Sequence, residues 1–343
     1  MKLNGSAALV WFALRRRGTL ALISLAISRC CSVALIGFAL CVCAGAQAQD
    51  YPSHPIQIVV PLPSGSVVDV MAREFARSME ARLGQKLLVI NREGGGFTIA
   101  MSAVANAPAD GYTIAFTPHT PLTIQVIRMK NLPYGRDSFV PLCQTYDLDF
   151  FVAVGSRSPF NDLAQLLGYA RAHPYELRYA TAGVATVLHL AAADLWQRAG
   201  VQLSDVPYKG EALFAPNLIS GEVDVAVVAP MLVATQRVRP LMVFGEHRLP
   251  RFAEVPSGDE LGYAARTAGW GGVFVRAGTP PAVMARIDAA CNSAVNDPSY
   301  RQVAERQFLV STYLDRAAFA ARVNAEYAQK EQLLKTLGLD KAP

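Results

Sequence analysis

Cysteine is scarce in this sequence and is concentrated at one end. Four of the six cysteines among the 343 residues precede residue 44, which leaves Cys143 and Cys291 for the rest of the chain. An oxidising compartment permits a disulfide between these two, but their distance in sequence does not establish one, and we expect buried free thiols. The five histidines are scattered, without HxxxH or HExxH spacing, so the sequence predicts no metal site.

Motifs of nucleotide binding and of hydrolysis are also missing. GxxxxGK[ST] does not occur, GxGxxG does not follow the first predicted strand, and GxSxG is absent. A catalytic triad of Ser64 or Ser66, His119 or His189, and Asp69 is conceivable. Asp69 stands just inside a predicted helix, however, where a cap or dipole partner is the simpler role. We therefore predict a protein that is not an enzyme and has no cofactor.

No acidic residue precedes Asp50, so the charge of the N-terminal segment is entirely positive. Five of the 32 Lys and Arg residues lie there, and the remaining 27 balance the 27 Asp and Glu residues. The formal net charge of +5 therefore belongs to this segment. A neutral body argues against nucleic-acid binding, which needs a basic face.

The same N-terminal segment has the pattern of a secretory signal. Basic residues precede an apolar stretch over residues 30–44, and Ala46-Gln47-Ala48 follows it. The stretch is shorter than the ~20 apolar residues that a spanning helix needs, which disfavours an uncleaved membrane anchor. We predict a signal peptide over residues 1–48, with cleavage after Ala48.

The remainder alternates strand and helix patterns, which is typical of an α/β fold with largely parallel sheets. Met71, Phe75, Met79 and Leu83 recur every four residues as one stripe of a helix, which ends at Gly84. The predicted strands lie at residues 56–60, 86–90, 112–116, 150–154, 177–180, 223–228, 241–244 and 272–275. Further helices are predicted at residues 98–106, 187–199, 299–307 and 316–337, the last with Asp315 as its cap. Two more are predicted to begin after caps at Asn161 and Thr279, and another ends at residue 219. Two α/β halves without a flexible linker indicate lobes joined by crossing strands, with a ligand cleft between them.

Several loops follow the carboxyl ends of predicted strands, where open α/β sheets bind ligands. Residues 62–69, 91–97 and 181–189 combine small residues with a helix start, whose free amides can bind a carboxylate. Lys209, in the loop at 208–211, is able to steer an anion, although most lysines simply lie at the surface. Trp270 is either a wall of the cleft or a core aromatic residue.

Short stretches in a fixed order carry a family resemblance. "YPSHPIQIVVPLPSG" comes first, and "LGQKLLVINREGGG", "ADGYTIAF", "LRYATAG", "HLAAADLW", "VPYKG", "SGEVDVAVV" and "RAGTPPAVMARI" follow. Through essentially the whole mature chain, the sequence resembles the periplasmic substrate-binding receptors of tripartite tricarboxylate transporters, often called Bug-type receptors. The resemblance implies a two-lobed, type II-like periplasmic-binding-protein fold, a Venus flytrap in which each lobe is a mostly parallel sheet flanked by helices. We place lobe I at residues 49–152 plus 244–343 and lobe II at 153–243.

The resemblance also implies the function and the site. It predicts a periplasmic receptor, a monomer, that closes on a small carboxylated metabolite for the membrane components of a tripartite transporter. The alternative is a sensor that signals through a membrane kinase. The family holds ligand carboxylates with amides, hydroxyls and waters of two loops. Together with the residues weighed above, this predicts ligand contacts from Ser64, Gly65, Ser66, Val68, Asp69, Thr181, Ala182, Gly183, Thr186, His189, Tyr208, Lys209 and Trp270.

Several positions depart from the family pattern in the same direction. Hydroxyl, amide or glycine positions of the family are here occupied by apolar residues, namely Val67, Val68, Phe97, Val184, Ala185, Val187 and Val228. A hydrogen bond to a charged group contributes about 1.5–3 kcal/mol, so the loss of several affects binding. Our hypothesis is a smaller, more apolar cleft that selects a monocarboxylate with a hydrocarbon or aromatic body. The competing hypothesis is that dicarboxylate binding is weakened and nothing replaces it.

Overall fold

The structure, a computed structural model, describes residues 51–263 and 269–340. The predicted signal peptide and its cleavage site lie outside these ranges. Residues Pro52–Pro343 form one compact unit, and every element below belongs to it. Within the described ranges no helix is both long and apolar enough to cross a membrane.

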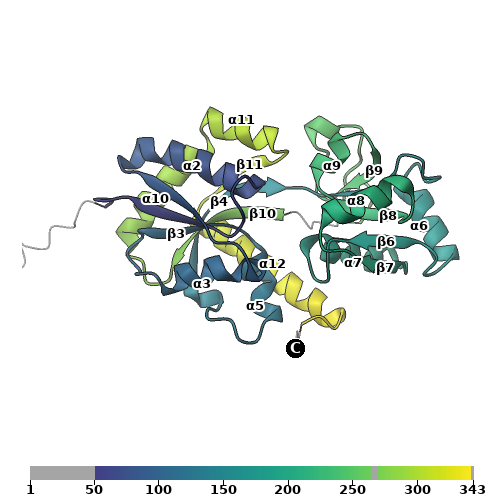
Figure 1. The fold of residues 1–343 in the computed structure, drawn as a ribbon, viewed down its shortest axis with the longest axis horizontal. Coiled ribbons are helices and arrows are strands. Elements are labelled where there is room, and N and C mark those ends of the chain that lie inside the picture. Colours follow the sequence, from purple (N-terminus) through teal and green to yellow (C-terminus); the bar gives the residue numbers. More distant parts are fainter. Residues whose placement is uncertain (1–50, 264–268, 341–343) are drawn as a thin grey trace, which may run out of the picture. The chain divides into compact units, whose positions relative to one another are not determined.

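Eleven strands in the described ranges form two sheets (Figure 1). The six-stranded sheet has the order β11-β4-β10-β3-β1-β2, and the five-stranded sheet has the order β7-β6-β8-β5-β9. The strands of the first sheet are β1 (Ile56–Val60), β2 (Leu87–Asn91), β3 (Thr113–Pro118), β4 (Phe139–Leu148), β10 (Gly269–Arg276) and β11 (Val310–Leu314). Those of the second are β5 (Phe151–Gly155), β6 (Arg178–Thr181), β7 (Ser204–Pro207), β8 (Val225–Val228) and β9 (Val238–Val243).

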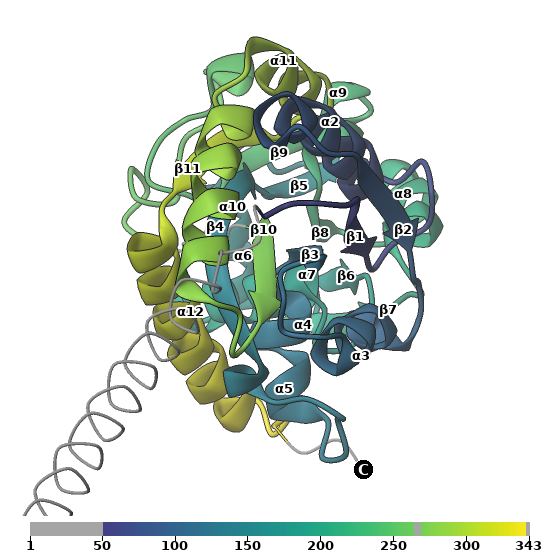
Figure 2. The same ribbon diagram turned by 90° about the vertical axis from the view of Figure 1, so that its left-hand side faces the viewer.

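Helices cover both faces of each sheet. In Figure 1, α2, α10 and α11 lie on one side of the six-stranded sheet, with α3 and α12 on the other, and Figure 2 shows α3, α4 and α5 grouped together. The helices of this half are α2 (Val67–Leu83), α3 (Thr98–Asn106), α4 (Thr120–Thr123), α5 (Gln125–Arg128), α10 (Pro281–Val295), α11 (Pro298–Arg306) and α12 (Arg316–Thr336). Those of the other half are α6 (Leu163–Ala172), α7 (Val187–Ala199), α8 (Glu211–Ser220) and α9 (Pro230–Ala234). Three 3₁₀ turns lie at Gly95–Phe97, Arg136–Ser138 and Pro250–Phe252.

The α/β class with two sheets is confirmed, but both sheets are mixed, and the prediction of mostly parallel sheets was wrong. β1 pairs in parallel with β2 and β3, whereas β10 runs antiparallel to β3 and β4. In the second sheet β6 pairs in parallel with β7 and β8, whereas β5 runs antiparallel to β8 and β9. β5 and β10 are the strands through which the chain enters one sheet from the other. Each begins beside the carboxyl ends of the parallel strands of its sheet, and it therefore runs antiparallel to its neighbours.

Hydrophobic periodicity predicted the first helix correctly. Met71, Phe75 and Met79 are fully buried, because residues four apart lie on one face of a helix. The Phe75 ring packs against Phe116 of β3, with ring centroids 5.3 Å apart. Gly84 ends the helix with φ 68°, a left-handed conformation that glycine adopts without strain.

Two predicted helix caps lie one residue away from the observed caps. Asp162 caps α6, because its carboxylate accepts a hydrogen bond from the Gln165 amide at 2.8 Å. The N-cap of α10 is Pro280, while the Thr279 hydroxyl donates to the carbonyl of Arg276. The division into lobes at residues 153 and 243 stays a prediction.

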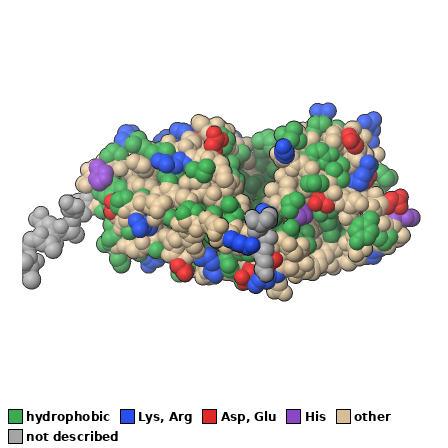
Figure 3. Space-filling view, turned by 60° about the horizontal axis from the view of Figure 1, so that its bottom comes forward, with side chains coloured by type: hydrophobic (Ala, Val, Ile, Leu, Met, Phe, Trp, Pro, Cys, Tyr) green, Lys and Arg blue, Asp and Glu red, His purple; other side chains and the backbone are tan. Residues whose placement is uncertain are grey.

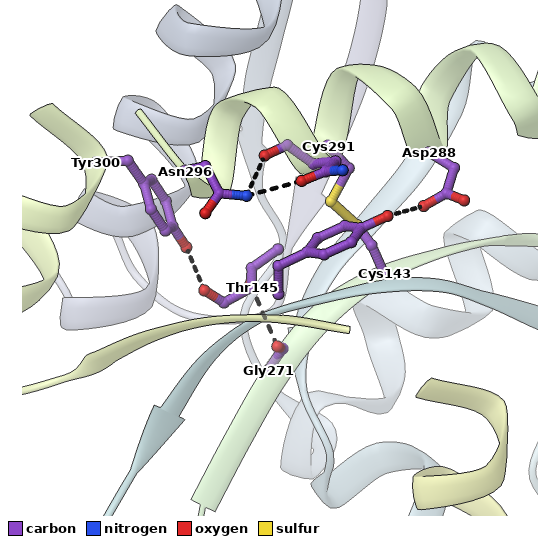
Figure 4. The surroundings of a disulfide bond; sticks show 9 residues. Cys143, Thr145, Gly271, Asp288, Cys291, Asn296 and Tyr300 are labelled. Carbon is purple, nitrogen blue, oxygen red and sulfur yellow. Dashed lines mark hydrogen bonds between the residues drawn. A yellow bond between two sulfur atoms is a disulfide. The ribbon is translucent and has the colours of Figure 1, made fainter. Parts of the chain in front are cut away.

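A disulfide joins Cys143 of β4 to Cys291 of α10, and our expectation of free thiols was wrong (Figure 4). Both cysteines are fully buried, and their Cα atoms are 6.7 Å apart, within the range that a disulfide spans. The two residues are separated by 148 positions, so only the packing of α10 on β4 brings them together. The bond therefore ties a covering helix to the sheet.

Gly272 of β10 occupies a space that admits no side chain. A Cβ atom there would lie 2.4 Å from the Cys143 carbonyl oxygen and 2.6 Å from the Phe319 ring. We expect Gly272→Ala to lower the free energy of unfolding by about 3 kcal/mol, because the backbone of β4 must move. Urea denaturation measures this loss.

The matched control for this substitution is Gly168→Ala. Gly168 lies inside α6, and its added Cβ would meet nothing within 4 Å. Alanine in a helix interior is expected to raise stability by about 0.5–1 kcal/mol. Equal effects of the two substitutions would contradict the close approach of β10 and β4.

Candidate ligand-binding site

Three of the four predicted loops, at residues 62–69, 91–97 and 181–189, meet at one cavity of about 510 Å³, whereas the loop at 208–211 does not line it. Its wall is formed by residues from both halves of the molecule, including Val68 after β1, Trp270 of β10 and Thr186 before α7. The hollow visible in Figure 3 has largely hydrophobic side chains on its surface. A larger hollow of about 650 Å³ lies beside α2 and α10, but none of the predicted site residues lines it. The cavity near the loops is therefore the candidate site.

The first loop closes on itself at the start of α2. Ser66 is the N-cap, and its hydroxyl accepts from the Asp69 amide at 3.3 Å. The Asp69 carboxylate in turn accepts from the Gly65 amide at 2.8 Å and from Arg73 and Asn91. Burial alone raises the pKa of Asp69, but these hydrogen bonds lower it below its ordinary value. Asp69 thus acts as the anion at this helix start.

The second loop repeats the arrangement at the start of α7. Thr186 is the N-cap and accepts from the His189 amide, while the His189 Nδ1 atom accepts from the Ala185 amide at 2.8 Å. Burial lowers the pKa of His189, and the charge of Arg128 lowers it further against the opposing effect of Asp205. His189 is therefore suited to its role as a neutral acceptor.

Three of the thirteen predicted site residues line the cavity, namely Val68, Thr186 and Trp270. Five others lie in the same two loops without lining it and hold or shape them; these are Gly65, Ser66, Asp69, Gly183 and His189. The exposed Ser64, the buried Thr181 and the half-buried Ala182 also lie outside the wall. Tyr208 accepts from Asn217 at 2.7 Å, and Lys209 is exposed. Direct ligand contact by these residues stays a prediction.

The valines that depart from the family pattern divide into two groups. Val67, Val68, Val184 and Val187 line the cavity, together with Phe97 and Ala185. Val228 does not, because it is fully buried in the core between β8, α8 and α9. The valine at position 228 therefore affects core packing and says nothing about which ligand the cavity binds.

Sequence reasoning assigned no ligand-binding role to three polar residues of the wall, and it weighed one of them, His119, only as a member of a catalytic triad. His119 follows β3, Arg128 ends α5 and Tyr146 lies in β4, and all three line the cavity. Only His119 carried a usable signal, since it stands at the carboxyl end of a predicted strand. Arg128 lies past that loop, and β4 was not predicted as a strand.

A largely buried carboxylate on α12, 13% exposed, holds two of the wall residues in place. The Glu326 Oε1 atom lies 3.0 Å from His119 Nδ1, and its Oε2 atom accepts from the Trp270 indole N–H. Lys330, one turn further along α12, is 1% exposed. Burial raises the pKa of Glu326, but the charges of His119 and Lys330 and these hydrogen bonds lower it to about 2. Glu326 is thus an anion that orients His119 and Trp270.

The charge on the cavity wall has one sign. Arg128 is the charged residue of the described lining, which contains no Asp or Glu. Helices α2 and α7 also begin at this wall with Val67 and Val187, and helix N-termini carry partial positive charge. Elsewhere in the described ranges, no cluster of three or more His, Cys, Asp or Glu residues is arranged to hold a metal ion. The wall thus favours an organic anion.

Comparison with known proteins gives one consistent family. The model of the tripartite tricarboxylate transporter family receptor matches residues 71–339. A UPF0065 protein from the tcbD-tcbE intergenic region of Pseudomonas sp. strain P51 is 38% identical, over 72% of this chain and 76% of its own length.

Solved structures give the same result. A TctC solute binding protein from Polaromonas is similar with a TM-score of 0.74 and 27% identity, over 83% of this chain and 99% of that one. R. palustris Rpa4515, solved with adipate, is similar with a TM-score of 0.72 and 26% identity, over 85% and 100% of the two chains.

Proposed function

The chain belongs to the receptor family of the tripartite tricarboxylate transporters, and from this we propose that it is exported to the periplasm, where it captures a small carboxylate for the membrane components of such a transporter. The family and its structural relatives are substrate-binding receptors and not enzymes. The adipate bound by the R. palustris relative supports a carboxylate as the ligand class. The cavity of about 510 Å³ has room for a ligand of this size.

We further propose that this pocket selects a monocarboxylate with a hydrocarbon or aromatic body. The composition of the cavity wall carries this proposal. Val67, Val68, Val184 and Val187 stand on both sides of it, and Trp270 adds an aromatic surface. A second ligand carboxylate against such residues would be desolvated without a hydrogen-bonding partner, which is costly.

A thermal-shift panel tests the proposed function. The protein from Gln49 onward is melted with benzoate, nicotinate, isovalerate and hexanoate, and separately with succinate, citrate and glutamate. A ligand at a hundred times its Kd adds about 2.7 kcal/mol of stability, so a monocarboxylate that binds raises the Tm by several degrees. A strong response to the di- and tricarboxylates alone would contradict the selectivity.

Val68→Thr reports on the apolar wall, because threonine keeps the shape of valine and adds a hydroxyl. We expect about three- to tenfold weaker binding of the selected monocarboxylate, since the hydroxyl is desolvated against an apolar ligand. Val310→Thr, on the exposed surface of β11, is the matched control and should leave the Kd unchanged.

A further inference from the structure

The polar groups that the sequence assigned to ligand binding are largely used within the chain. The Gly65 amide donates to Asp69, and the Ala185 amide donates to His189. The Ser66 hydroxyl accepts from Asp69, and the Thr186 hydroxyl donates to Gly183. A ligand carboxylate that used these particular groups would have to displace bonds that cap α2 and α7.

Unpartnered polar atoms occur instead on the side of the cavity formed by the six-stranded half. His119 Nε2 and Tyr146 Oη have no hydrogen-bond partner in the described structure. Both residues line the cavity, and they are 1% and 2% exposed. A buried polar group normally finds a partner, and one that lacks it indicates a missing ligand or water.

Arg128 adds an uncompensated charge at the same wall. Its Nε atom is buried without a partner, and no described carboxylate forms an ion pair with it. Arg128 is close enough to α7 to lower the pKa of His189, so its charge stands beside the positive end of a helix. The Arg128 side chain is half-buried, and an anion in the cavity would supply the counter-charge that no described carboxylate provides.

His119 Nε2 and Tyr146 Oη are both available to a ligand. His119 Nδ1 lies 2.9 Å from Thr123 Oγ1 and 3.0 Å from Glu326 Oε1. Both of these contacts are made by Nδ1, so Nε2 is left for a ligand. Burial raises the pKa of Tyr146, which therefore keeps its phenolic proton.

We propose that the ligand carboxylate is held by the side chains of His119, Tyr146 and Arg128, while its hydrocarbon body lies against the valines of the two loops. This inference rests on the proposed function, because it assumes that a monocarboxylate occupies the cavity. It assigns charge recognition to three polar residues of the six-stranded half and shape recognition to the valines of both loops.

The test compares an acid with its own amide. From benzoate, nicotinate, isovalerate and hexanoate, the acid with the largest Tm shift is taken together with its primary amide, and both Kd values are measured by calorimetry. Tyr146→Phe and Arg128→Gln should each weaken acid binding about tenfold to hundredfold, as expected for a hydrogen bond to a charged group. Both substitutions should change amide binding much less, so the preference for the acid over the amide falls.

Tyr146→Phe also separates binding from folding. It removes an unpartnered buried hydroxyl, so the ligand-free variant should melt at the wild-type Tm or above it. Tyr134→Phe is the matched control, since Tyr134 is a buried tyrosine outside the cavity whose hydroxyl bonds to Pro121. This control should leave the Kd of the acid unchanged.

Two failures are distinguishable. If wild type binds none of the four acids, the proposed function fails and this inference falls with it. If wild type binds an acid and both Tyr146→Phe and Arg128→Gln bind it equally well, the inference alone is overturned. A loss of binding in Ser64→Ala with normal binding in Tyr146→Phe would return the carboxylate to the first loop.

Discussion

Removal of the disulfide is expected to lower the free energy of unfolding by up to about 5 kcal/mol. The bond closes a loop of 148 residues, and in the chain-entropy model a loop of this length restricts the unfolded state by about 5 kcal/mol, while native disulfides generally contribute about 2–5 kcal/mol. The double variant Cys143→Ala/Cys291→Ala removes it without leaving a free thiol. Urea denaturation of this variant and of wild type under non-oxidising, non-reducing conditions gives the difference.

Reductant supplies the control for the disulfide experiment. Both cysteines are fully buried, so dithiothreitol reaches the bond only through unfolding, and wild type needs long equilibration before its midpoint falls. The same reductant should leave the midpoint of the double variant unchanged. Equal midpoints for oxidised wild type and the double variant would show that the bond contributes no stability.

Loss of the Glu326 carboxylate is expected to be nearly as costly. Glu326→Ala removes the anion that lies 3.0 Å from the buried His119 and acts on the buried Lys330, and it leaves Trp270 without its acceptor. Breaking a buried pair by removing one partner costs about 3–5 kcal/mol. Urea denaturation at pH 7 measures this loss. Glu331→Ala, which breaks an exposed pair with Lys335 on the same helix, is the control and should change stability by less than about 1 kcal/mol.

The effect of Glu326 also has a defined pH dependence. Its pKa is lowered in the folded protein from its ordinary value near 4.5 to about 2. A carboxyl group with a lowered folded-state pKa stabilises the fold above its unfolded pKa, and this stability is lost as the pH falls toward the folded value. The difference between wild type and Glu326→Ala should therefore be largest above pH 5 and shrink between pH 4.5 and pH 2. A difference that grows in this interval would contradict the assignment.

The elements that the sequence predicted well are those with a local signal. The strand at Ile56–Val60 and the helix at Val187–Ala199 were predicted with their observed bounds, because an apolar run and a glycine stop need no distant partner. The Asp315 cap of α12 is likewise confirmed, with the Ala318 amide donating to it at 2.9 Å.

The strands that escaped prediction depend on distant partners. β4 contains Gln144 and Thr145, which are fully buried although they are polar. Gln144 accepts from Arg322 of α12, and Thr145 donates to the Gly271 carbonyl. The sequence of β4 does not reveal either partner, so its polar residues do not indicate a central strand. β7 and β11 were missed as well, because each is a short edge strand without a buried apolar run.

The same limit applies to the site. The two helix-start loops were found from small residues after strands, but nothing local shows that Asp69 and His189 turn back to cap their own loops. The significance of His119, Arg128 and Tyr146 lies in the partners that they lack, and a missing partner is a property of three-dimensional packing. The disulfide was missed for a related reason, since pairing over 148 positions requires the fold.

The position of the disulfide has a consequence for how specificity can be exchanged. Cys143 and Cys291 enclose all five strands of the second sheet and the whole of α7. The half that contains the second sheet is therefore an insert in the six-stranded half, which we call the frame, and the disulfide joins the parts of the frame that precede and follow the insert. Proteolytic cleavage of the chain within the insert would leave the two fragments linked by this bond. The insert carries Val184 and Val187, whereas His119 and Arg128 belong to the frame. Grafting the insert of a relative onto this frame is then a way to exchange Val184 and Val187 while the proposed anion anchor stays with the host.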